Sequence, residues 1–379
     1  MRAKKNVIYY LCILLFLMIA FFSNDFNLVN VQKTAIITAI AIDKEEEEFS
    51  LTALIANPAS QGTNSEGGGN QSTPTADGYA TVQGKGGTVA EALEDVNAKT
   101  GWYPKLVFCR VLLLGESLCR GNVFDALDYF LRNEYAADDP LLAATDGKAS
   151  DLLKAKPPLK AAVSEAIEKV LSDQPKRVGA VLTASLRPFA ISYFSAGGSG
   201  YMPLLSKQTE EGGDAFNASK TALFQNGRRI GTLDEEGTFA LACIQNPLRL
   251  ASFTVKSGGQ QHTLVVKQNQ RKLRFHVEED DPIMRIQLTL YAEWTDGASS
   301  QNLGALSGRE ERSALYANAA KALAEQIQSA FAYCKNIGFD AFDAIGKLQK
   351  YENNHFEHLK DSLVERLQLD LSVRFAPIR

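Results

Sequence analysis

The sequence predicts an α+β protein in which an N-terminal membrane anchor precedes mixed α/β subdomains, the C-terminal one an antiparallel sheet packed with long helices. Three observations predict this class. The first is an uncharged apolar run at residues 7–22. The second is alternation of apolar and polar residues between 272 and 294, and the third is an apolar stripe at helical spacing between 315 and 334. A period of two is typical of half-buried strands, and a period near 3.6 of amphipathic helices.

The anchor is predicted from the run Val7–Phe22, which has no charged residue and follows the cations Arg2, Lys4 and Lys5. Such a run is either a secretory signal or a membrane anchor with its positive side in the cytoplasm, so the chain from about Ser23 onward is expected to be exported. Residues 20–25 (AFFSND) offer no Ala-x-Ala site for signal peptidase. We therefore predict an uncleaved transmembrane anchor, with a cleaved signal as the alternative.

Length and charge bound the rest of the chain. The 379 residues exceed one ordinary hydrophobic core, so more than one domain is expected. We predict an anchor at 1–23, an α/β region at 24–206 that divides into two subdomains if a break falls near 156–178, and an α+β domain at 207–379. A formal net charge of -4 is close to balance and argues against a nucleic-acid partner.

The cysteines do not resemble a disulfide framework. Cys12 lies within the apolar run, and the other four are scattered at Cys109, Cys119, Cys243 and Cys334. Disulfide frameworks belong to small, densely bridged chains, so we predict buried thiols. A bridge between Cys109 and Cys119 is the alternative.

The first half alternates strand and helix patterns. Residues 35–58 read as a β-hairpin, and the Gly- and Ser-rich stretch 59–78 as a mobile loop between strands. The further elements expected are strands at 79–84, 106–114 and 141–145, and helices at 88–97, 122–132, 148–155, 159–171 and 178–194, the last with Pro188 as a kink or boundary.

The second half has clearer signals. Asn226–Gly227 accepts the positive φ angles of a hairpin turn, and Asp234 caps the helix that follows. Ser307 and Glu310 form a capping box before a long helix. The other elements expected are strands at 248–255, 263–267, 272–278, 283–294 and 369–375, and a helix at 356–367.

No pattern singles out a catalytic, cofactor-binding or metal-binding residue. Gly84–Thr88 lacks the spacing of a phosphate loop, so we interpret it as a glycine-rich turn. His355 and His358 flank Glu357 without the HExxH order or a third ligand, and we interpret them as exposed surface residues. Gly197–Gly200 lacks the strand-to-helix turn of a serine nucleophile. We therefore predict a protein that is not an enzyme and has no cofactor.

Several segments stand in an order that resembles a known family. The most specific is TALFQNGRRIGTLDEEGTFAL at 221–241. The others are TAIITAIAIDK at 34–44, FSLTALIANP at 49–58, GKGGTVAEALEDV at 84–96, the segment 106–133, DGKASDLLK at 146–154, YMPLL at 201–205 and FDAFDAIGKLQK at 339–350. Together they resemble the C subunit of bacterial spore germinant receptors, the Ger(x)C family, over nearly all of the exported chain.

This resemblance implies a non-enzymatic protein of three mixed α and β subdomains on the outer face of a membrane, either the spore inner membrane or the cell membrane. It implies two partners, a multi-spanning A subunit and a transporter-like B subunit. The complex would respond to small nutrients such as amino acids or sugars, and the partner subunits are expected to bind them.

The chain departs from the family at its anchor. Family members usually carry a lipobox cysteine just after the apolar run, whereas here Ser23, Asn24 and Asp25 follow it. A retained helix is therefore expected to replace the lipid as the tether. The alternative function is a stand-alone membrane-anchored solute-binding protein that captures its ligand without partners.

Overall fold

The computed structural model describes residues 10–18, 34–56, 78–158, 162–173, 181–257, 259–297 and 309–378. Residues 59–77 of the loop predicted at 59–78, Ser307 of the capping box and most of the predicted anchor lie outside the described residues. Residues 10–18, within the run predicted to be an anchor, are helical, with exposed side chains. Within the described ranges, no helix is both long enough and apolar enough to span a bilayer.

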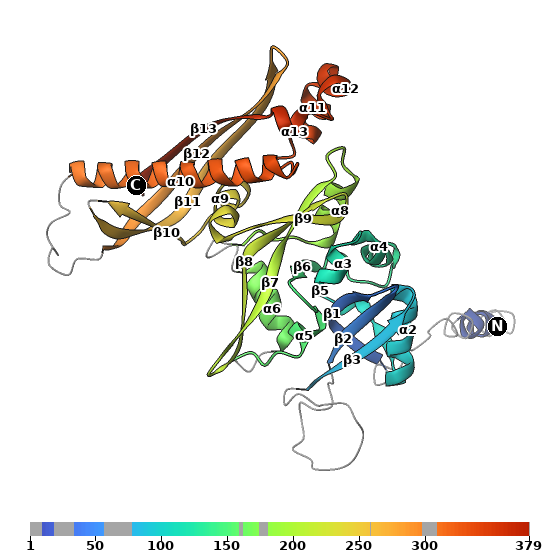
Figure 1. Cartoon of the computed structure of the whole chain (residues 1–379). Coiled ribbons are helices and arrows are strands. Elements are labelled where there is room, and N and C mark those ends of the chain that lie inside the picture. The colour runs from blue at the N-terminus through green and yellow to red at the C-terminus, as the bar shows by residue number, and fades with distance from the viewer. Residues whose placement is uncertain are drawn as a thin grey trace, which may run out of the picture.

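The first sheet has nine strands, in the order β3-β2-β1-β5-β6-β7-β8-β9 with β4 paired to the start of β1 (Figure 1). Its centre is parallel, because β1, β5, β6 and β7 pair in parallel, and its two ends are antiparallel. The strands are β1 (Thr34–Glu45), β2 (Glu48–Ala56), β3 (Tyr79–Gly86), β4 (Tyr103–Lys105), β5 (Val111–Leu114), β6 (Leu141–Thr145), β7 (Ser199–Glu210), β8 (Gly213–Gln225) and β9 (Arg228–Leu233).

Helices cover both faces of this sheet. In β1, Ile40 and Ile42 belong to the core on one face, and Ala39 and Ala41 to the core on the other. A strand buried on both faces reads as a nearly continuous apolar run, and residues 35–42 have this pattern, with Thr38 as their one polar residue. The first face packs against α2 (Val89–Thr100), α3 (Glu116–Cys119), α4 (Phe124–Arg132) and α8 (Leu186–Phe194), and the second against α5 (Ser150–Leu153) and α6 (Val163–Ser172).

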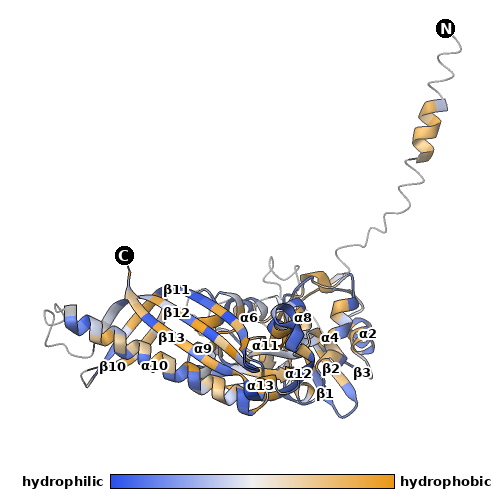
Figure 2. Ribbon diagram, turned by 90° about the horizontal axis from the view of Figure 1, so that it is seen from above, coloured by the Kyte–Doolittle hydropathy of each residue, from blue (hydrophilic) through white to orange (hydrophobic). Residues whose placement is uncertain are grey.

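The second sheet has the order β10-β11-β12-β13 and packs against one long helix, α10 (Figure 1). Figure 2 shows hydrophobic and hydrophilic residues alternating along its strands, as expected for a sheet with one wet face. The elements are α9 (Glu235–Gln245), β10 (Ala251–Ser257), β11 (Gln260–Glu278), β12 (Asp281–Gly297), α10 (Arg309–Asn336), α11 (Ala344–Tyr351), η5 (Asn353–His355), α12 (Phe356–Leu359), α13 (Leu363–Arg366) and β13 (Gln368–Pro377).

Several sequence predictions are confirmed. The hairpin at 35–58 is β1–β2, and Asn226 and Gly227 have φ angles of 49° and 76° in the turn between β8 and β9. Asp234 accepts a hydrogen bond from the Gly237 amide and caps α9. The stripe on α10 is buried except for the half-buried Phe331; its buried members are Leu315, Ala319, Leu323, Ile327 and Cys334.

The C-terminal sheet is not purely antiparallel, which corrects one prediction. β13 pairs in parallel with β12 along its whole length, from Gln368 opposite Ile283 to Pro377 opposite Ala292. The physical reason is the connection between the two strands. In sequence, α10 and the helices after it separate β12 from β13, and this long crossover lets the chain return in the same direction. The strands predicted at 263–267 and 272–278 are one strand, β11, and α10 is the one long helix among the described residues.

Three further predictions are wrong in local detail. The helix predicted at 356–367 is interrupted at 360–362 and forms α12 and α13, although Leu359 and Leu363 are buried as expected. The strand predicted at 106–114 begins with a 3-10 turn, because Leu106 and Cys109 both turn inward. Of the helix predicted at 178–194, residues 178–180 lie outside the described residues and 181–185 are not helical; α8 begins at Leu186, with Pro188 in its first turn, where proline is tolerated.

The predicted division between residues 206 and 207 lies within β7, which continues to Glu210 and pairs with β8. β8 and β9 belong to the nine-stranded sheet, and α9 then leads into the second sheet. Leu223 of β8 and Leu233 of β9 join the core that contains α9 and α10. The domain boundaries stay a prediction.

Candidate functional site

The structure explains the glycine-rich turn by packing. A Cβ added at Gly84 would lie 2.1 Å from the Ala92 carbonyl oxygen, and one at Gly86 would lie 2.5 Å from the Glu91 Cβ. Thr88 caps α2, and its Oγ1 accepts a hydrogen bond of 3.2 Å from the Glu91 amide. These glycines bring α2 directly onto β3.

The histidine pair lies at the end of the second sheet where β11 turns into β12. His358 is exposed as predicted, whereas His355 is half-buried, and its Nδ1 lies 3.5 Å from an oxygen of Asp280. A search of the described residues finds no group of three or more His, Cys, Asp and Glu side chains placed to hold a metal ion.

Ser199, the serine within the segment Gly197–Gly200, forms hydrogen bonds with uncharged groups. Its hydroxyl donates a hydrogen bond of 2.6 Å to the Gln225 side chain and accepts one of 3.3 Å from the Asp340 amide. These contacts tie the start of β7 to β8 and to the segment before α11. A structural role follows from them.

All four cysteines of the folded body are buried free thiols. Burial raises the pKa of Cys109, Cys119 and Cys334 to about 12, and it also raises the pKa of Cys243. A thiol with so high a pKa carries almost no thiolate at neutral pH, so these side chains act as small apolar core residues. The alternative bridge between Cys109 and Cys119 does not form.

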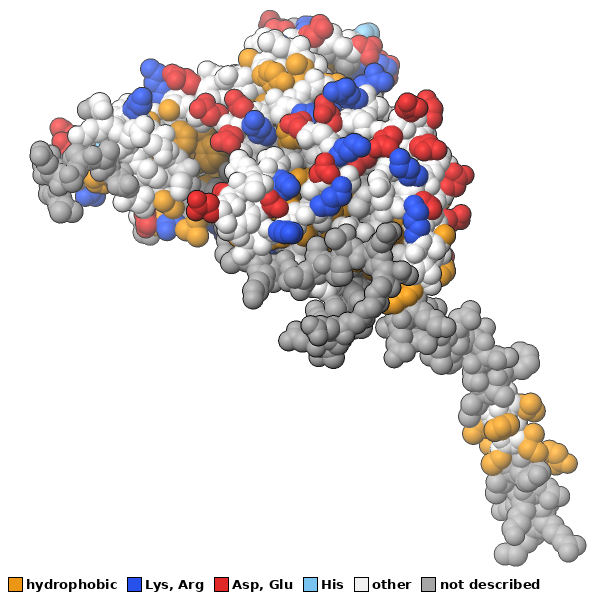
Figure 3. All heavy atoms as spheres, turned by 60° about the horizontal axis from the view of Figure 1, so that its bottom comes forward, with side chains coloured by type: hydrophobic (Ala, Val, Ile, Leu, Met, Phe, Trp, Pro, Cys, Tyr) orange, Lys and Arg blue, Asp and Glu red, His pale blue; other side chains and the backbone are white. Residues whose placement is uncertain are grey.

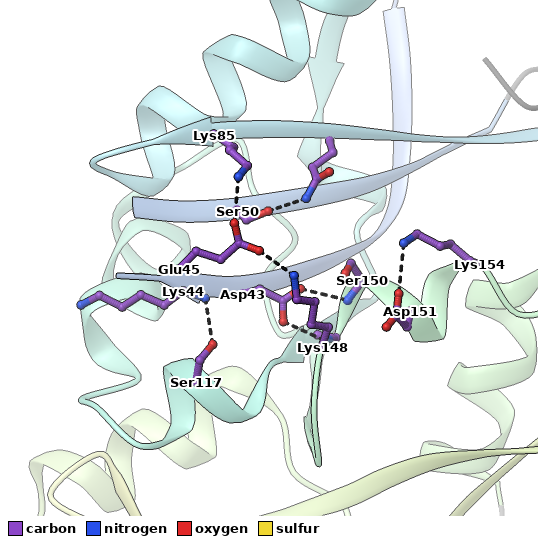
Figure 4. Close-up of polar contacts among 12 residues, drawn as sticks. Asp43, Lys44, Glu45, Ser50, Lys85, Ser117, Lys148, Ser150, Asp151 and Lys154 are labelled. Carbon is purple, nitrogen blue, oxygen red and sulfur yellow. Dashed lines mark hydrogen bonds and ion pairs between the residues drawn. The ribbon is translucent and has the colours of Figure 1, made fainter. Parts of the chain in front are cut away.

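A charged cluster at the end of β1 joins three segments (Figure 4). Asp43 is buried, and its carboxylate accepts hydrogen bonds from the backbone amides of Ala149 (2.7 Å) and Ser150 (3.1 Å). Two residues on, Glu45 accepts hydrogen bonds from Lys85 (2.8 Å) and Lys148 (2.7 Å). β1, the end of β3 and the turn before α5 are therefore held together by carboxylates.

Replacing Glu45 with glutamine is expected to produce a small, salt-dependent loss of stability. Hydrogen bonds from Lys148 and Lys85 lower the pKa of Glu45 from 4.5 to about 2. A depressed pKa in the folded state stabilises it above pH 4.5, and this contribution is lost as the pH falls from about 4.5 towards 2. Because the side chain is 37% exposed, water screens the pair, and we expect less than about 1 kcal/mol.

The measurement is chemical unfolding of the native and Glu45→Gln proteins at low and high salt and between pH 7 and pH 3. The exposed Glu47 is the matched control, since Glu47→Gln removes the same charge from the same turn. An effect of Glu45→Gln that high salt leaves unchanged would show that the ion pairs are not its source.

One candidate binding site is a cleft of about 390 Å³ between the two sheets. β7 contributes Tyr201, α9 contributes Gln245, and β11 contributes Arg271. The Tyr201 hydroxyl donates to the Gln245 side chain at 2.8 Å, and Gln245 donates to the Ala341 carbonyl at 2.9 Å. Burial raises the pKa of Tyr201, so its hydroxyl stays protonated as a donor.

The segment 339–347 forms one wall of the cleft and is organised by Asp340. This buried carboxylate accepts hydrogen bonds from the amides of Ala344 and Ile345, both at 2.8 Å. Asp343 follows in the left-handed region at φ 53°, and Lys347 donates to the Phe342 carbonyl. Both Asp343 and Lys347 line the cleft.

The cleft thus combines two cationic side chains, Arg271 and Lys347, with the carboxyl groups of Asp340 and Asp343 and with polar groups. Such a lining can hold a small solute that carries both charges or several hydroxyl groups. None of these residues is predicted as a site from the sequence, because they come from separate segments with no shared motif. The segment FDAFDAIGKLQK contains six of the lining residues, but its sequence signals only the resemblance to the family.

Comparison with solved structures finds a related fold. The crystal structure of the GerBC protein matches with a TM-score of 0.53 and 16% sequence identity, covering 92% of this chain and all of that one. At this identity the likeness concerns the fold alone.

Comparison of sequences finds a curated relative. Spore germination protein B3 from Bacillus subtilis (strain 168) is 21% identical over 276 residues, which are 72% of this chain and 71% of that protein.

Two protein families match along the chain. Residues 27–207 match the family described as "Spore germination protein N-terminal domain", and residues 219–376 match "Spore germination B3/ GerAC like, C-terminal". The two matches follow one another and together cover most of the 379 residues. The chain therefore belongs to the Ger(x)C family of spore germination proteins.

Proposed function

We propose that this chain is a non-enzymatic, membrane-anchored, extracytoplasmic subunit of a nutrient germinant receptor, and that it supports spore germination by assembling with multi-spanning A and B subunits. The observation that carries the proposal is the match to both family regions in order, over residues 27–207 and 219–376. The hydrogen bond that Ser199 donates to Gln225 and the burial of the four thiols also favour a structural rather than a catalytic role.

The tether in this proposal is the apolar run Val7–Phe22. Its described part, residues 10–18, is helical with exposed apolar side chains such as Phe16 and Tyr10, which suits contact with lipid. Since Ser23 and not a cysteine follows the run, a retained helix is the proposed anchor. Mass spectrometry of the purified protein is expected to find an intact N-terminus without diacylglycerol, and a diacylated or truncated chain would contradict this anchor.

Deleting the gene tests the germination role. Spores without this chain are expected to lose their response to at least one nutrient, while a trigger that bypasses nutrient receptors still germinates them. The native gene, reintroduced, should restore the response, and affinity purification of the tagged chain should recover the A and B subunits. Normal germination of the deletion strain with every nutrient tested would make the germination role wrong.

The cleft favours one second candidate, a stand-alone solute-binding protein. Arg271 lines the cleft, whereas the neighbouring Lys272 does not, so Lys272→Ala is a matched control for Arg271→Ala. In this case, calorimetric titration of the purified full-length chain with amino acids and sugars would show binding without partners, weakened at least tenfold by Arg271→Ala. If no solute gave a heat of binding, the stand-alone solute-binding function would be wrong, and binding of the nutrient would be assigned to the partner subunits.

A further inference from the structure

Four large side chains with apolar bodies stand exposed around β4, and we call them the aromatic patch. They are Tyr103 (63% exposed), Val107 (53%), Phe108 (52%) and Tyr135 (75%). Soluble surfaces rarely gather aromatic side chains in this way, so a contact surface is indicated. By contrast, the face of the molecule in Figure 3 intersperses Lys and Arg with Asp and Glu side chains.

The backbone holds the patch outward. In the 3-10 turn Leu106–Phe108, the buried Leu106 and the buried Cys109 point into the core, which leaves Val107 and Phe108 facing out. The Leu106 carbonyl accepts hydrogen bonds from the amide of Cys109 at 2.9 Å and from that of Ala137 at 3.1 Å. The second bond ties the loop that carries Tyr135 to the same turn, so the patch is a built surface.

The patch lies where the folded body begins. β4 pairs in parallel with the first residues of β1, and Tyr103 stands opposite Thr34. Eleven residues, 23–33, separate Thr34 from the end of the apolar run at Phe22. Fully extended, this length spans at most about 40 Å, so an anchored run keeps this edge of the body near the bilayer.

We propose that the aromatic patch rests on the lipid bilayer surface and orients the folded body on the membrane; this rests on the proposed tether. Tyrosine side chains suit the interface, because the ring lies among acyl chains while the hydroxyl group stays among head groups. The Lys105 ammonium lies 6.0 Å from the Tyr103 ring, where it can reach lipid phosphates. Glu134 precedes Tyr135, so the surface is not polybasic, and contact should not require anionic lipid.

Fluorescence quenching by lipid tests the contact. The chain has two tryptophans, Trp102 and Trp294, and both are replaced with phenylalanine in the full-length protein. Phe108→Trp then reports on the patch. The matched control is Tyr351→Trp, since Tyr351 is 63% exposed on α11, which Figure 1 draws far from β1. Each protein is reconstituted without partners into phosphatidylcholine vesicles that contain acyl-brominated phosphatidylcholine.

We expect the Phe108→Trp emission to fall by roughly twofold or more in brominated vesicles, and the Tyr351→Trp emission to stay unchanged. Native circular dichroism confirms that each variant is folded. If the protein floats with the vesicles but its patch reporter is not quenched, the patch proposal is overturned while the tether stands. Failure to float overturns both. Emission that changes only after A and B subunits are added would assign the patch to a protein partner and overturn the lipid contact.

Discussion

Replacing Asp43 with alanine is expected to lower the free energy of unfolding of the first sheet by about 2–4 kcal/mol. The Asp43 carboxylate is 2% exposed and accepts the amide hydrogens of Ala149 and Ser150, 106 and 107 residues away in sequence. Hydrogen bonds to an ionised group are stronger than neutral ones, and their loss leaves two amides at the start of α5 without this acceptor. The link between β1 and α5 is lost with them.

Gly115 supplies a sharp test of the geometry. A Cβ added there would lie 2.0 Å from an oxygen of Asp43, so Gly115→Ala should displace the carboxylate and be about as damaging as Asp43→Ala. In the Asp43→Ala background the obstacle is gone, and Gly115→Ala should then cost less than about 1 kcal/mol. Gly121→Ala is the control, because its nearest contact is an ordinary 3.5 Å to the Leu118 carbonyl oxygen.

The two tryptophans allow the two sheets to be followed separately. Trp102 packs against the core of the first sheet, and Trp294 lies in the second. Chemical unfolding of single-tryptophan proteins should show the Asp43→Ala transition moving to lower denaturant with Trp102 as reporter, and moving less with Trp294. Additive effects of Asp43→Ala and Gly115→Ala would contradict the proposed contact.

Replacing Gly84 with alanine is expected to destabilise the same sheet by about 2–3 kcal/mol. The added Cβ would meet the Ala92 carbonyl at 2.1 Å and the Val96 amide nitrogen at 2.8 Å, and both atoms belong to the backbone of α2. A helix backbone cannot swing away as a side chain can, so α2 must move off β3. The loss should appear in denaturant unfolding with Trp102 as reporter.

Gly87→Ala is the matched control for Gly84→Ala. The two glycines lie three residues apart, but a Cβ at Gly87 meets only the Glu91 side chain, at 3.4 Å. We expect a change within about 0.5 kcal/mol for this variant. Equal losses for the two variants would mean that chain flexibility and not the packing of α2 on β3 determines the effect.

Local patterns were the part of the fold that the sequence could predict. The β1–β2 hairpin, the turn at Asn226 and Gly227 and the buried stripe of α10 depend on residues near one another in the chain. Period, caps and turn residues act over such distances, so they can be read without a structure. The interruption between α12 and α13 could not be predicted from the sequence, because Leu359 and Leu363 keep helical spacing across the break.

Long-range pairing could not be predicted. Nothing within Leu369–Phe375 distinguishes a strand that joins β12 in parallel from one that joins it antiparallel, since alternation is the same in both cases. The cleft depends on the same kind of information. Tyr201, Arg271 and Lys347 meet only after both sheets have formed, whereas the turn at Gly84 and the histidines could be judged from their own neighbours.

The late position of β13 has a consequence for how this protein is made. Seventy residues separate the end of β12 at Gly297 from the start of β13 at Gln368, and β13 comes last among the strands in the described part of the chain. During synthesis, the edge of β12 that pairs with β13 therefore stays open until residues 368–377 have been made. Open edges recruit other strands, so the chain is prone to aggregate during this interval, and deletion of residues 368–377 would leave the edge open permanently.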